Sequence, residues 1–260
     1  MDHLLVIDAG NARLKWAVAD RCGWSMSGSI PNSNVGVLAL THWQNIERPM
    51  RVIGVNVAGK GMQHKIEMQM MRWRVQVEWL TAQPEAAGIK NSYADPSRLG
   101  ADRWAALAAA YRRQRRAAGT PPMPCLVISL GTATTIDALS ADGIFLGGLV
   151  LPGFALMRQS LAAHTAGLSL EITKGAYADF PTTTGDAVFS GAIQAIRGAI
   201  AEMRTLLAAR HETEASRIMT FVAGGDTPSF LPHLSEPLTI VDNLVLEGVL
   251  TLAAPEYLPE

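Results

Sequence analysis

Two stretches of the chain share one pattern of apolar and polar positions, and each predicts a strand, a tight turn and a second strand. They run from Leu5 to Lys15 and from Leu126 to Asp137. Each begins Leu-Val-Ile and reaches a glycine that is followed by a small polar residue and Ala. Short apolar runs broken at glycine are typical of paired strands joined by a turn. The repeat therefore predicts one hairpin in each half of the chain, and hence two related lobes.

The rest of the pattern alternates further strands with helices. We expect strands over 51–57, 74–80 and 218–223, and a pair of strands within 143–152. We expect helices over 59–72, 102–118, 153–163, 187–210 and 242–253, with a turn-rich connection over 31–35. Gly and Pro residues over 119–124 separate the halves. The result is an α/β protein with an N-terminal lobe over 1–118 and a C-terminal lobe over 119–260.

Composition narrows the class of protein without naming a function. The 260 residues are 48% hydrophobic and 17% charged, which is typical of a packed globular chain. The net charge of −1 gives no electrostatic reason to expect nucleic acid as a partner. The most apolar stretch, 144–157, is interrupted by glycine and proline, and no basic region precedes a long apolar run at the start. We therefore expect a cytoplasmic protein that binds neither nucleic acid nor membrane.

The first repeat ends its strand on a carboxylate. Asp8 could simply cap a turn, but its apolar strand, the duplicated turn and Lys15 four residues after Asn11 favour a phosphate site. In that interpretation Asp8 holds Mg²⁺ directly or through water, and Gly10 and Asn11 present N–H groups to phosphates. Lys15 then offsets charge on the transferred phosphoryl group.

Further candidates follow in the second half. Gly131 and Thr132 form the matching turn, and Thr134 follows it, although threonine is also common in strands for its β propensity. Asp137 is either a second carboxylate near the metal or a polar residue at a strand end. Gly225 and Asp226 after an apolar strand are a plausible nucleotide contact.

Asp102 and Arg103 form a third element. An Asp in the first turn of a helix is often an ordinary cap. The adjacent pair after Gly100 also suits a base for a hydroxyl group and a clamp for a carboxylate.

Taken in order, these motifs resemble those of type III pantothenate kinases, a family that includes proteins called Bvg accessory factor. The motifs are Asp8-x-Gly-Asn-x-x-x-Lys15, Tyr93 with Leu-Gly-x-Asp102-Arg103, Gly131-Thr-Ala-Thr-Thr-x-Asp137, Gly147-Gly148 with Pro152-Gly153, Thr184-x-x-Ala187-x-x-x-Gly191 and Gly224-Gly225-Asp226. The resemblance implies the acetate and sugar kinase/Hsc70/actin fold with two ribonuclease-H-like lobes, and a homodimer. It implies ATP-dependent phosphorylation of pantothenate to 4′-phosphopantothenate, the first committed step toward coenzyme A.

The resemblance also implies roles residue by residue. Asp102 matches the general base that deprotonates the pantothenate hydroxyl, and Arg103 would bind the pantothenate carboxylate. The same pocket would include Tyr93, Gly100, Ala101 and Thr184. The ATP phosphates would meet Asp8, Gly10, Asn11, Lys15, Gly131, Thr132 and Thr134, with Gly147, Gly148, Gly225 and Asp226 on the adenosine side.

Two departures from the family pattern leave alternatives open. Ser129 stands where many members carry an Asp associated with K⁺ or NH₄⁺, and a hydroxyl offers an oxygen but no charge. Ala12 replaces the usual Thr in the first turn. A kinase of the same fold for another hydroxyl substrate, such as a sugar, is one rival hypothesis, although a neutral sugar needs no carboxylate clamp. A non-catalytic accessory or regulatory protein that keeps the nucleotide fold is the other.

Overall fold

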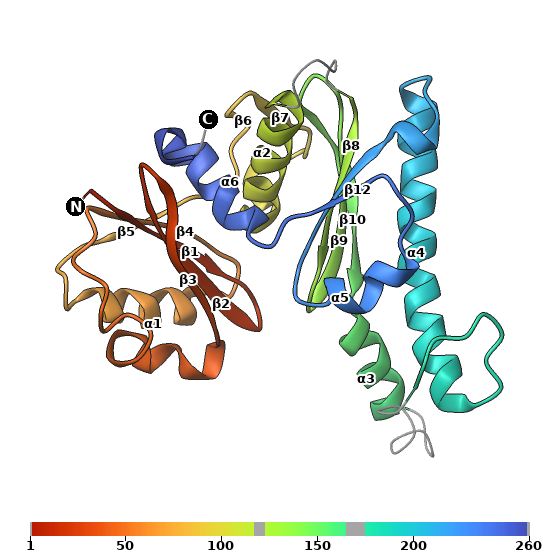
Figure 1. Cartoon of the computed structure of the whole chain (residues 1–260), viewed down its shortest axis with the longest axis horizontal. Coiled ribbons are helices and arrows are strands. Elements are labelled where there is room, and N and C mark those ends of the chain that lie inside the picture. The colour runs from red at the N-terminus through yellow and green to blue at the C-terminus, as the bar shows by residue number, and fades with distance from the viewer. Residues whose placement is uncertain (1, 117–122, 165–174, 259–260) are drawn as a thin grey trace. The chain divides into compact units, whose positions relative to one another are not determined.

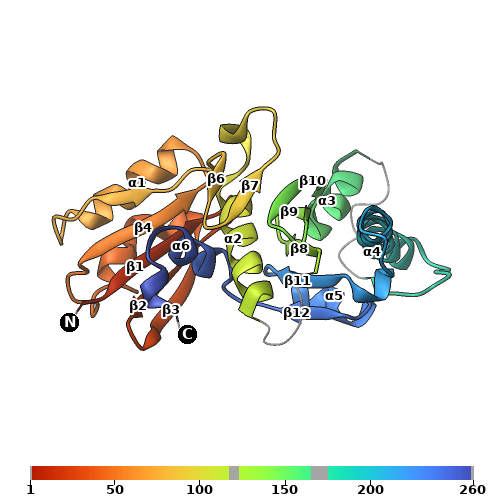
Figure 2. The same cartoon turned by 90° about the horizontal axis from the view of Figure 1, so that it is seen from above.

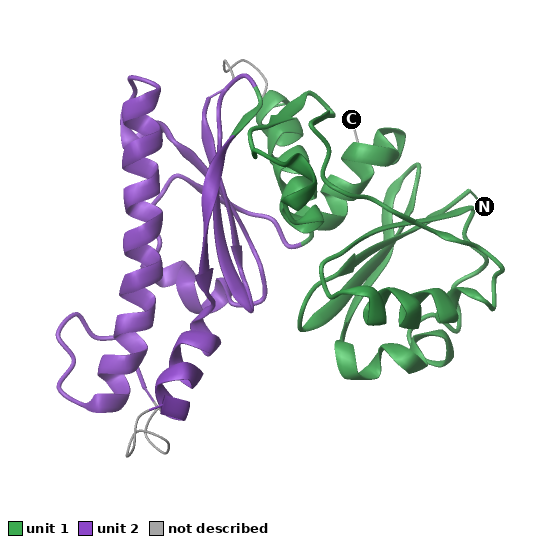
Figure 3. Cartoon of the chain, turned by 180° about the vertical axis from the view of Figure 1, so that it is seen from behind, with its two compact units in different colours: residues 1–120, 143–145, 243–260 green, residues 121–142, 146–242 purple. Residues whose placement is uncertain are grey.

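The computed structural model describes residues 2–116, 123–164 and 175–258, and the chain forms two compact units. Unit 1 comprises residues 1–120, 143–145 and 243–260, and unit 2 comprises residues 121–142 and 146–242 (Figure 3). These units differ from the lobes expected from the sequence, because two later segments of the chain belong with the first unit. The end of the predicted helix over 102–118 falls outside the described residues.

Unit 1 is built on a five-stranded sheet in the order β3-β2-β1-β4-β5 (Figure 1). The predicted hairpin is confirmed as β1 (Leu4–Ala9) and β2 (Arg13–Asp20), which pair antiparallel. Strands β4 (Arg51–Asn56) and β5 (Val77–Trp79) extend the sheet in parallel, and β3 (Gly23–Pro31) forms its other edge.

Strand β1 is apolar throughout because both of its faces are covered. Leu5 and Ile7 pack with α1 (Lys60–Met70), whereas Leu4 and Val6 on the opposite face pack with α2 (Ala101–Arg116) and α6 (Leu244–Ala253). Figure 1 shows α1 on one side of this sheet and α2 with α6 on the other. An uninterrupted apolar strand is what burial on both faces requires.

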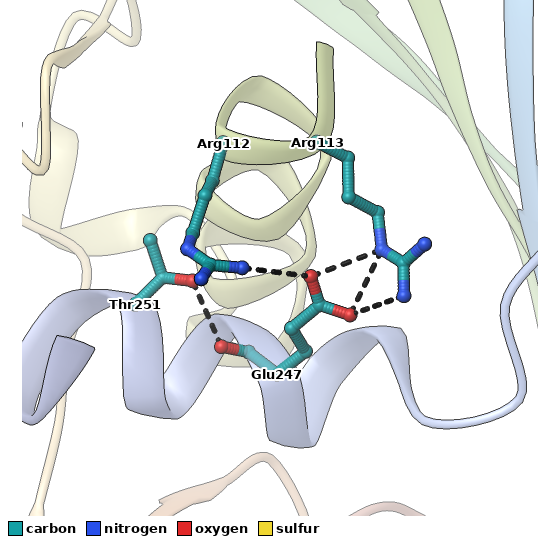
Figure 4. A network of polar contacts seen from close by, with 4 residues as sticks. All are labelled: Arg112, Arg113, Glu247 and Thr251. Atoms are coloured by element: carbon teal, nitrogen blue, oxygen red, sulfur yellow. Dashed lines mark hydrogen bonds and ion pairs between the residues drawn. The ribbon is translucent and has the colours of Figure 1, made fainter. Parts of the chain in front are cut away.

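Helix α6 joins unit 1 because it packs directly on α2. A Cβ atom added to Gly248 would overlap the backbone of Ala105, so only glycine permits this approach. The buried carboxylate of Glu247 accepts from Arg113 Nε at 2.8 and 2.9 Å and lies 3.8 Å from Arg112 Nη1 (Figure 4). Close backbone contact and a charged pair together hold the C-terminal helix to the first half of the chain.

Shorter elements complete unit 1. The connection after β3 is a 3₁₀ helix, η1 (Asn32–Leu40), and a second one, η2 (Pro96–Arg98), precedes α2. Strands β6 (Glu85–Ala86) and β7 (Ile89–Asn91) form a small hairpin, and β7 pairs in parallel with residues 144 and 145. A last 3₁₀ turn, η5 (Pro255–Tyr257), follows α6.

Unit 2 repeats the strand-turn-strand plan. The second predicted hairpin is confirmed as β8 (Cys125–Leu130) and β9 (Ala133–Leu139), and the strand order is β12-β11-β8-β9-β10. Strands β11 (Met219–Ala223) and β12 (Leu238–Ile240) are parallel additions next to β8. The expectation of two strands within 143–152 is wrong: these residues form one strand, β10 (Ile144–Pro152), because its glycines continue the strand instead of turning it.

One face of the unit 2 sheet is covered by helices. The helices α3 (Phe154–His164) and α4 (Thr184–Arg210) lie on the same side of β8 and β9 (Figures 1 and 2). Helix α4 begins three residues before the predicted start because Thr183 caps it, accepting from the Asp186 amide at 3.2 Å while donating to the Asp186 carboxylate at 2.8 Å. The helix α5 (Thr227–Phe230) and the 3₁₀ turns η3 (Ala215–Arg217) and η4 (Leu231–His233) are short connections. Among the described residues, no helix has the length and apolar character needed to cross a bilayer.

Candidate active site

The first glycine turn places a carboxylate opposite an amine. Asp8 and Lys15 are direct partners across the β1–β2 pair, so both side chains leave the same face of the sheet. The Gly10 amide donates to Arg13 O at 3.1 Å and closes the turn. A phosphate would therefore meet the amides at the exposed tip, where Asn11 and Ala12 lie, rather than the Gly10 amide itself.

Asn32 holds this turn from outside it. Its side-chain Nδ2 donates to Gly10 O and Asn11 O, both at 2.9 Å, and its backbone amide donates to Ala12 O at 3.1 Å. The sequence pattern does not mark this residue, because it lies about twenty positions after the turn and shares no motif with it.

Asp8 lies in unit 1 within electrostatic reach of Asp102. The pKa of Asp8 is raised to about 7, chiefly by burial and also by the Asp102 carboxylate, while Lys15 acts to lower it. Two carboxylates that repel each other beside a lysine are a suitable setting for a cation. Mg²⁺ commonly takes only one or two protein carboxylates and completes its shell with water and phosphate oxygens. A single carboxylate such as Asp8 is compatible with that donor set. Among the described residues, no three or more His, Cys, Asp or Glu side chains form a group that could hold a metal ion.

Asp102 lies inside the first turn of α2 rather than at its cap. Its Oδ1 accepts from the Arg103 amide at 2.8 Å and folds back over Gly100, where an added Cβ would lie 2.6 Å from that oxygen. Burial raises the pKa of Asp102, and the Arg103 amide and guanidinium oppose this shift. A carboxylate with a raised pKa is a stronger base than an ordinary Asp, and a general base works best when its pKa is near the operating pH. Gly100 and Ala101 thus adjoin the predicted base in space as well as in sequence.

Arg103 lies against two aromatic rings. Its Nη1 donates to Tyr93 Oη at 3.0 Å, and its guanidinium carbon is 5.8 Å from the ring centroids of both Tyr93 and Phe145. The two rings are themselves 5.5 Å apart. The structure therefore brings together the predicted Tyr93, Asp102 and Arg103. Phe145 was missed, because it lies in an apolar stretch that predicts only a core strand.

The second glycine turn is one residue shorter than the first. Gly131 donates to Ala133 O at 3.2 Å, so Ala133 occupies the place that Arg13 has in the first turn. The strands before the two turns share one burial pattern, with Asp8 and Ser129 as the partly exposed residue in each. The cross-strand partner of Ser129 is Thr135, whereas that of Asp8 is Lys15. The second turn thus lacks both charges of the first.

Two other glycines pack around the second turn. An added Cβ on Gly153 would overlap the carbonyl oxygens of the turn, and one on Gly224, whose φ is +112°, would overlap the backbone of Leu130. The Asp226 amide donates to Leu130 O at 3.0 Å. Because β8 and β11 are parallel, Gly131 and the exposed Gly225 follow the carboxyl ends of neighbouring strands, a common location for nucleotide binding. Burial raises the pKa of Asp226.

The remaining predicted residues are placed as follows. Thr132 is exposed at the tip of the second turn, whereas Thr134 is 1% exposed within β9. Asp137 is also 1% exposed, and its carboxylate lies against Gly148. Thr184 is exposed in the first turn of α4 in unit 2. Its contribution to the pocket of Tyr93 and Arg103 stays a prediction.

The fold defines the class of protein. The chain is similar to a solved structure described as a conserved Baf family transcriptional activator from Campylobacter jejuni, with a TM-score of 0.56, 18% identity and 94% of each chain covered. It is also similar to a structure described as a 2-dehydro-3-deoxygalactonokinase protein from Sinorhizobium meliloti, with the same TM-score of 0.56, 13% identity, and 95% of this chain and 96% of that one covered. The fold is that of the acetate and sugar kinase/Hsc70/actin superfamily, with two ribonuclease-H-like lobes.

Sequence relatives define the family. The family model for type III pantothenate kinase matches residues 4–205. The chain is 38% identical to the type III pantothenate kinase of Nitrosospira multiformis over 96% of this chain and 90% of that protein. It is 40% identical to the one from Methylibium petroleiphilum, over 96% of this chain and 98% of that protein. The chain therefore belongs to the type III pantothenate kinase family.

Proposed function

We propose that this protein transfers the γ-phosphoryl group of ATP to the primary hydroxyl of pantothenate, giving 4′-phosphopantothenate in the first step of coenzyme A biosynthesis. The observation that carries the proposal is the pairing of Asp102 with Arg103 on the first turn of α2, within electrostatic reach of the Asp8 carboxylate. This pairing supplies a base and a carboxylate clamp in one place, and family membership supports the same reaction.

On the acceptor side, Arg103 binds the pantothenate carboxylate and Asp102 takes the hydroxyl proton. The hydroxyl oxygen forms a bond to the γ-phosphorus while the bond from that phosphorus to the β–γ bridging oxygen breaks, so ADP leaves and the proton passes to Asp102. Such transfers depend mainly on positioning and charge neutralisation. The raised pKa of Asp102 suits this role, because it strengthens the base.

On the donor side, the first glycine turn and Lys15 of unit 1 bind phosphates of ATP. Backbone amides near Asn11 in unit 1 suit phosphate oxygens, as do those near Thr132 in unit 2. Gly225 and Asp226 follow the carboxyl end of β11, and we expect them to contact the adenosine. Asp8 would hold Mg²⁺, which neutralises charge on the phosphates when it is bound. A bound cation would favour the charged form of this carboxylate and so lower its raised pKa.

Two finer features of the family remain proposals for this chain. Ser129 offers a hydroxyl oxygen to K⁺ or NH₄⁺, and we expect a weaker dependence on these ions than a carboxylate would give. A homodimer is supported by the apolar side chains that unit 2 exposes, which include Leu149, Val150, Leu156 and Leu161. Light scattering should give twice the mass of one chain.

The direct test is an assay of the purified protein with ATP, Mg²⁺ and pantothenate, in parallel sodium, potassium and ammonium salts. We expect a product with the mass of 4′-phosphopantothenate and no phosphorylation of a panel of neutral sugars. Preferred transfer to a sugar would favour another kinase of this fold. ATP binding without transfer to any acceptor, in every salt, would favour a non-catalytic accessory protein.

A further inference from the structure

We propose that Phe145 is a positioning residue for the substrate carboxylate and that it acts through Arg103. The inference rests on the proposed function, because it concerns how the arginine that would bind pantothenate is oriented. The Phe145 ring is fully buried, and the Arg103 guanidinium lies above both this ring and that of Tyr93.

Phe145 reaches this place through the register of two short strands. In the parallel pairing of β10 with β7, Phe145 is the partner of Asn91. The Asn91 side chain donates to Pro96 O at 3.1 Å and accepts from the Tyr93 amide at 3.1 Å. Asn91 thereby fixes the loop that carries Tyr93. Because Asn91 is also the strand partner of Phe145, one residue links the positions of both rings.

A glycine contact fixes the same segment against α2. Gly143, with φ of +86°, lies so close to Gly88 and Tyr111 that an added Cβ would be 2.5 Å from Gly88 O and 2.9 Å from the Tyr111 ring. The Lys90 amide donates to Gly143 O at 2.9 Å. Tyr111 belongs to α2, the helix whose first turn carries Arg103. The start of β10 is therefore held against both β7 and α2.

The physical consequence concerns orientation. A guanidinium binds a carboxylate best when its planar fork can make two parallel hydrogen bonds, so its plane has to be fixed before the substrate arrives. Aromatic faces attract the cation without using its N–H donors, and the Tyr93 hydroxyl accepts from one of them. Phe145 thus supports the arginine while it competes for none of the donors that the carboxylate needs.

The test compares pantothenate with its neutral primary amide, which lacks the carboxylate that Arg103 would bind. For Phe145→Leu we expect kcat/KM for pantothenate to fall about 3- to 30-fold, mainly through KM, as for the loss of a cation–aromatic contact. The amide should change by no more than about twofold, because its use does not depend on the charge of Arg103. Tyr93→Phe keeps the ring but loses the hydroxyl contact, and it should shift the ratio of the two substrates in the same direction.

Two further variants separate positioning from folding. Phe145→Met fills much of the ring volume without an aromatic face, so it should lose the same preference even if Phe145→Leu is too unstable to assay. Phe221→Leu makes the same change at a buried residue of β11 in unit 2 and should leave the substrate ratio unchanged.

The outcomes separate the positioning role of Phe145 from the proposed function of the protein. Equal losses for pantothenate and amide in the Met variant, or no loss in either Phe145 variant, would overturn the positioning role. If Arg103→Ala nevertheless lost the preference for pantothenate, the proposed function would stand without it. A wild-type protein that phosphorylates neither compound would overturn both.

Discussion

Asp8 and Asp102 share an environment that makes their charge costly. Burial raises the pKa of each, and for Asp8 the neighbouring carboxylate adds to the effect. For Asp8, the proposed cation would offset the free-energy cost of the charged form when it binds. For Asp102, the charged form is the proposed base, and the raised pKa makes that base stronger.

The cost at Asp8 gives a stability prediction. Because the folded protein holds the Asp8 proton more tightly than the unfolded chain does, this proton stabilises the fold at low pH, and its contribution is lost as pH rises through about 7. Asparagine carries no charge at any pH. The quantity to compare is the unfolding free energy of Asp8→Asn minus that of the wild type, in Mg²⁺-free buffer. This difference should be about 1–3 kcal/mol more positive at pH 8 than at pH 4.

Chemical denaturation at the two pH values measures this difference, and the same variant should lose phosphoryl transfer. Mg²⁺ with ATP should stabilise the wild type more than the variant. If this difference is instead more negative at pH 8 than at pH 4, the charge of Asp8 does not destabilise the folded protein.

Single residues were predictable where local sequence carries their chemistry. Asp8 ends an apolar run and Asp102 lies in the first turn of a helix after a glycine, so both stand out in the pattern. Asn32 and Phe145 do not, because each acts on a residue more than twenty positions away through pairing that only the folded chain creates. An asparagine after a strand and a phenylalanine within one are ordinary by themselves.

At the scale of elements, the contact of α6 with α2 supports the helix whose first turn carries Asp102. Both helices cover the same face of the unit 1 sheet, and Gly248 allows their backbones to meet at Ala105, one turn after Asp102. Any side chain at Gly248 must push the helices apart or strain them.

This contact gives a prediction with a matched control. Gly248→Ala should lower the unfolding free energy by about 1–3 kcal/mol, because its Cβ enters the α2 backbone. Gly198 also lies inside a helix, α4, but an added Cβ there meets nothing within 4 Å. Gly198→Ala should be neutral or gain up to about 1 kcal/mol through helix propensity. Thermal and urea unfolding measure both, and equal effects from the two variants would contradict the packing argument.

Elements were predictable to the extent that their pattern is local. The two hairpins and the helices over 60–70 and 154–164 follow from apolar periodicity. Strand β3 was missed because its sequence is mostly small and polar, and it is a strand only through its pairing with β2. The expected pair of strands within 143–152 was wrong because glycine usually marks a turn, whereas here Gly148 lets the strand pass close to β9.

At the scale of the whole molecule, the two copies of the strand-turn-strand repeat differ in charge and in turn length. The first copy carries Asp8 opposite Lys15, and the second carries Ser129 opposite Thr135 on a shorter turn. The charged chemistry is therefore concentrated in unit 1, where Asp102 and Arg103 also lie. The return of residues 143–145 and 243–260 to unit 1 was not predictable, because it depends on tertiary contacts at Gly143 and Gly248.

The central claim is that this chain phosphorylates pantothenate with Asp102 as the base. The most direct measurement is the rate at which wild type and Asp102→Asn form 4′-phosphopantothenate at saturating ATP, Mg²⁺ and pantothenate, with substrate binding checked by calorimetry. We predict product from the wild type and a loss of about 10²- to 10⁴-fold in kcat for the variant, which should still bind both substrates. No product from the wild type, or a variant within a few-fold of it, would contradict the claim.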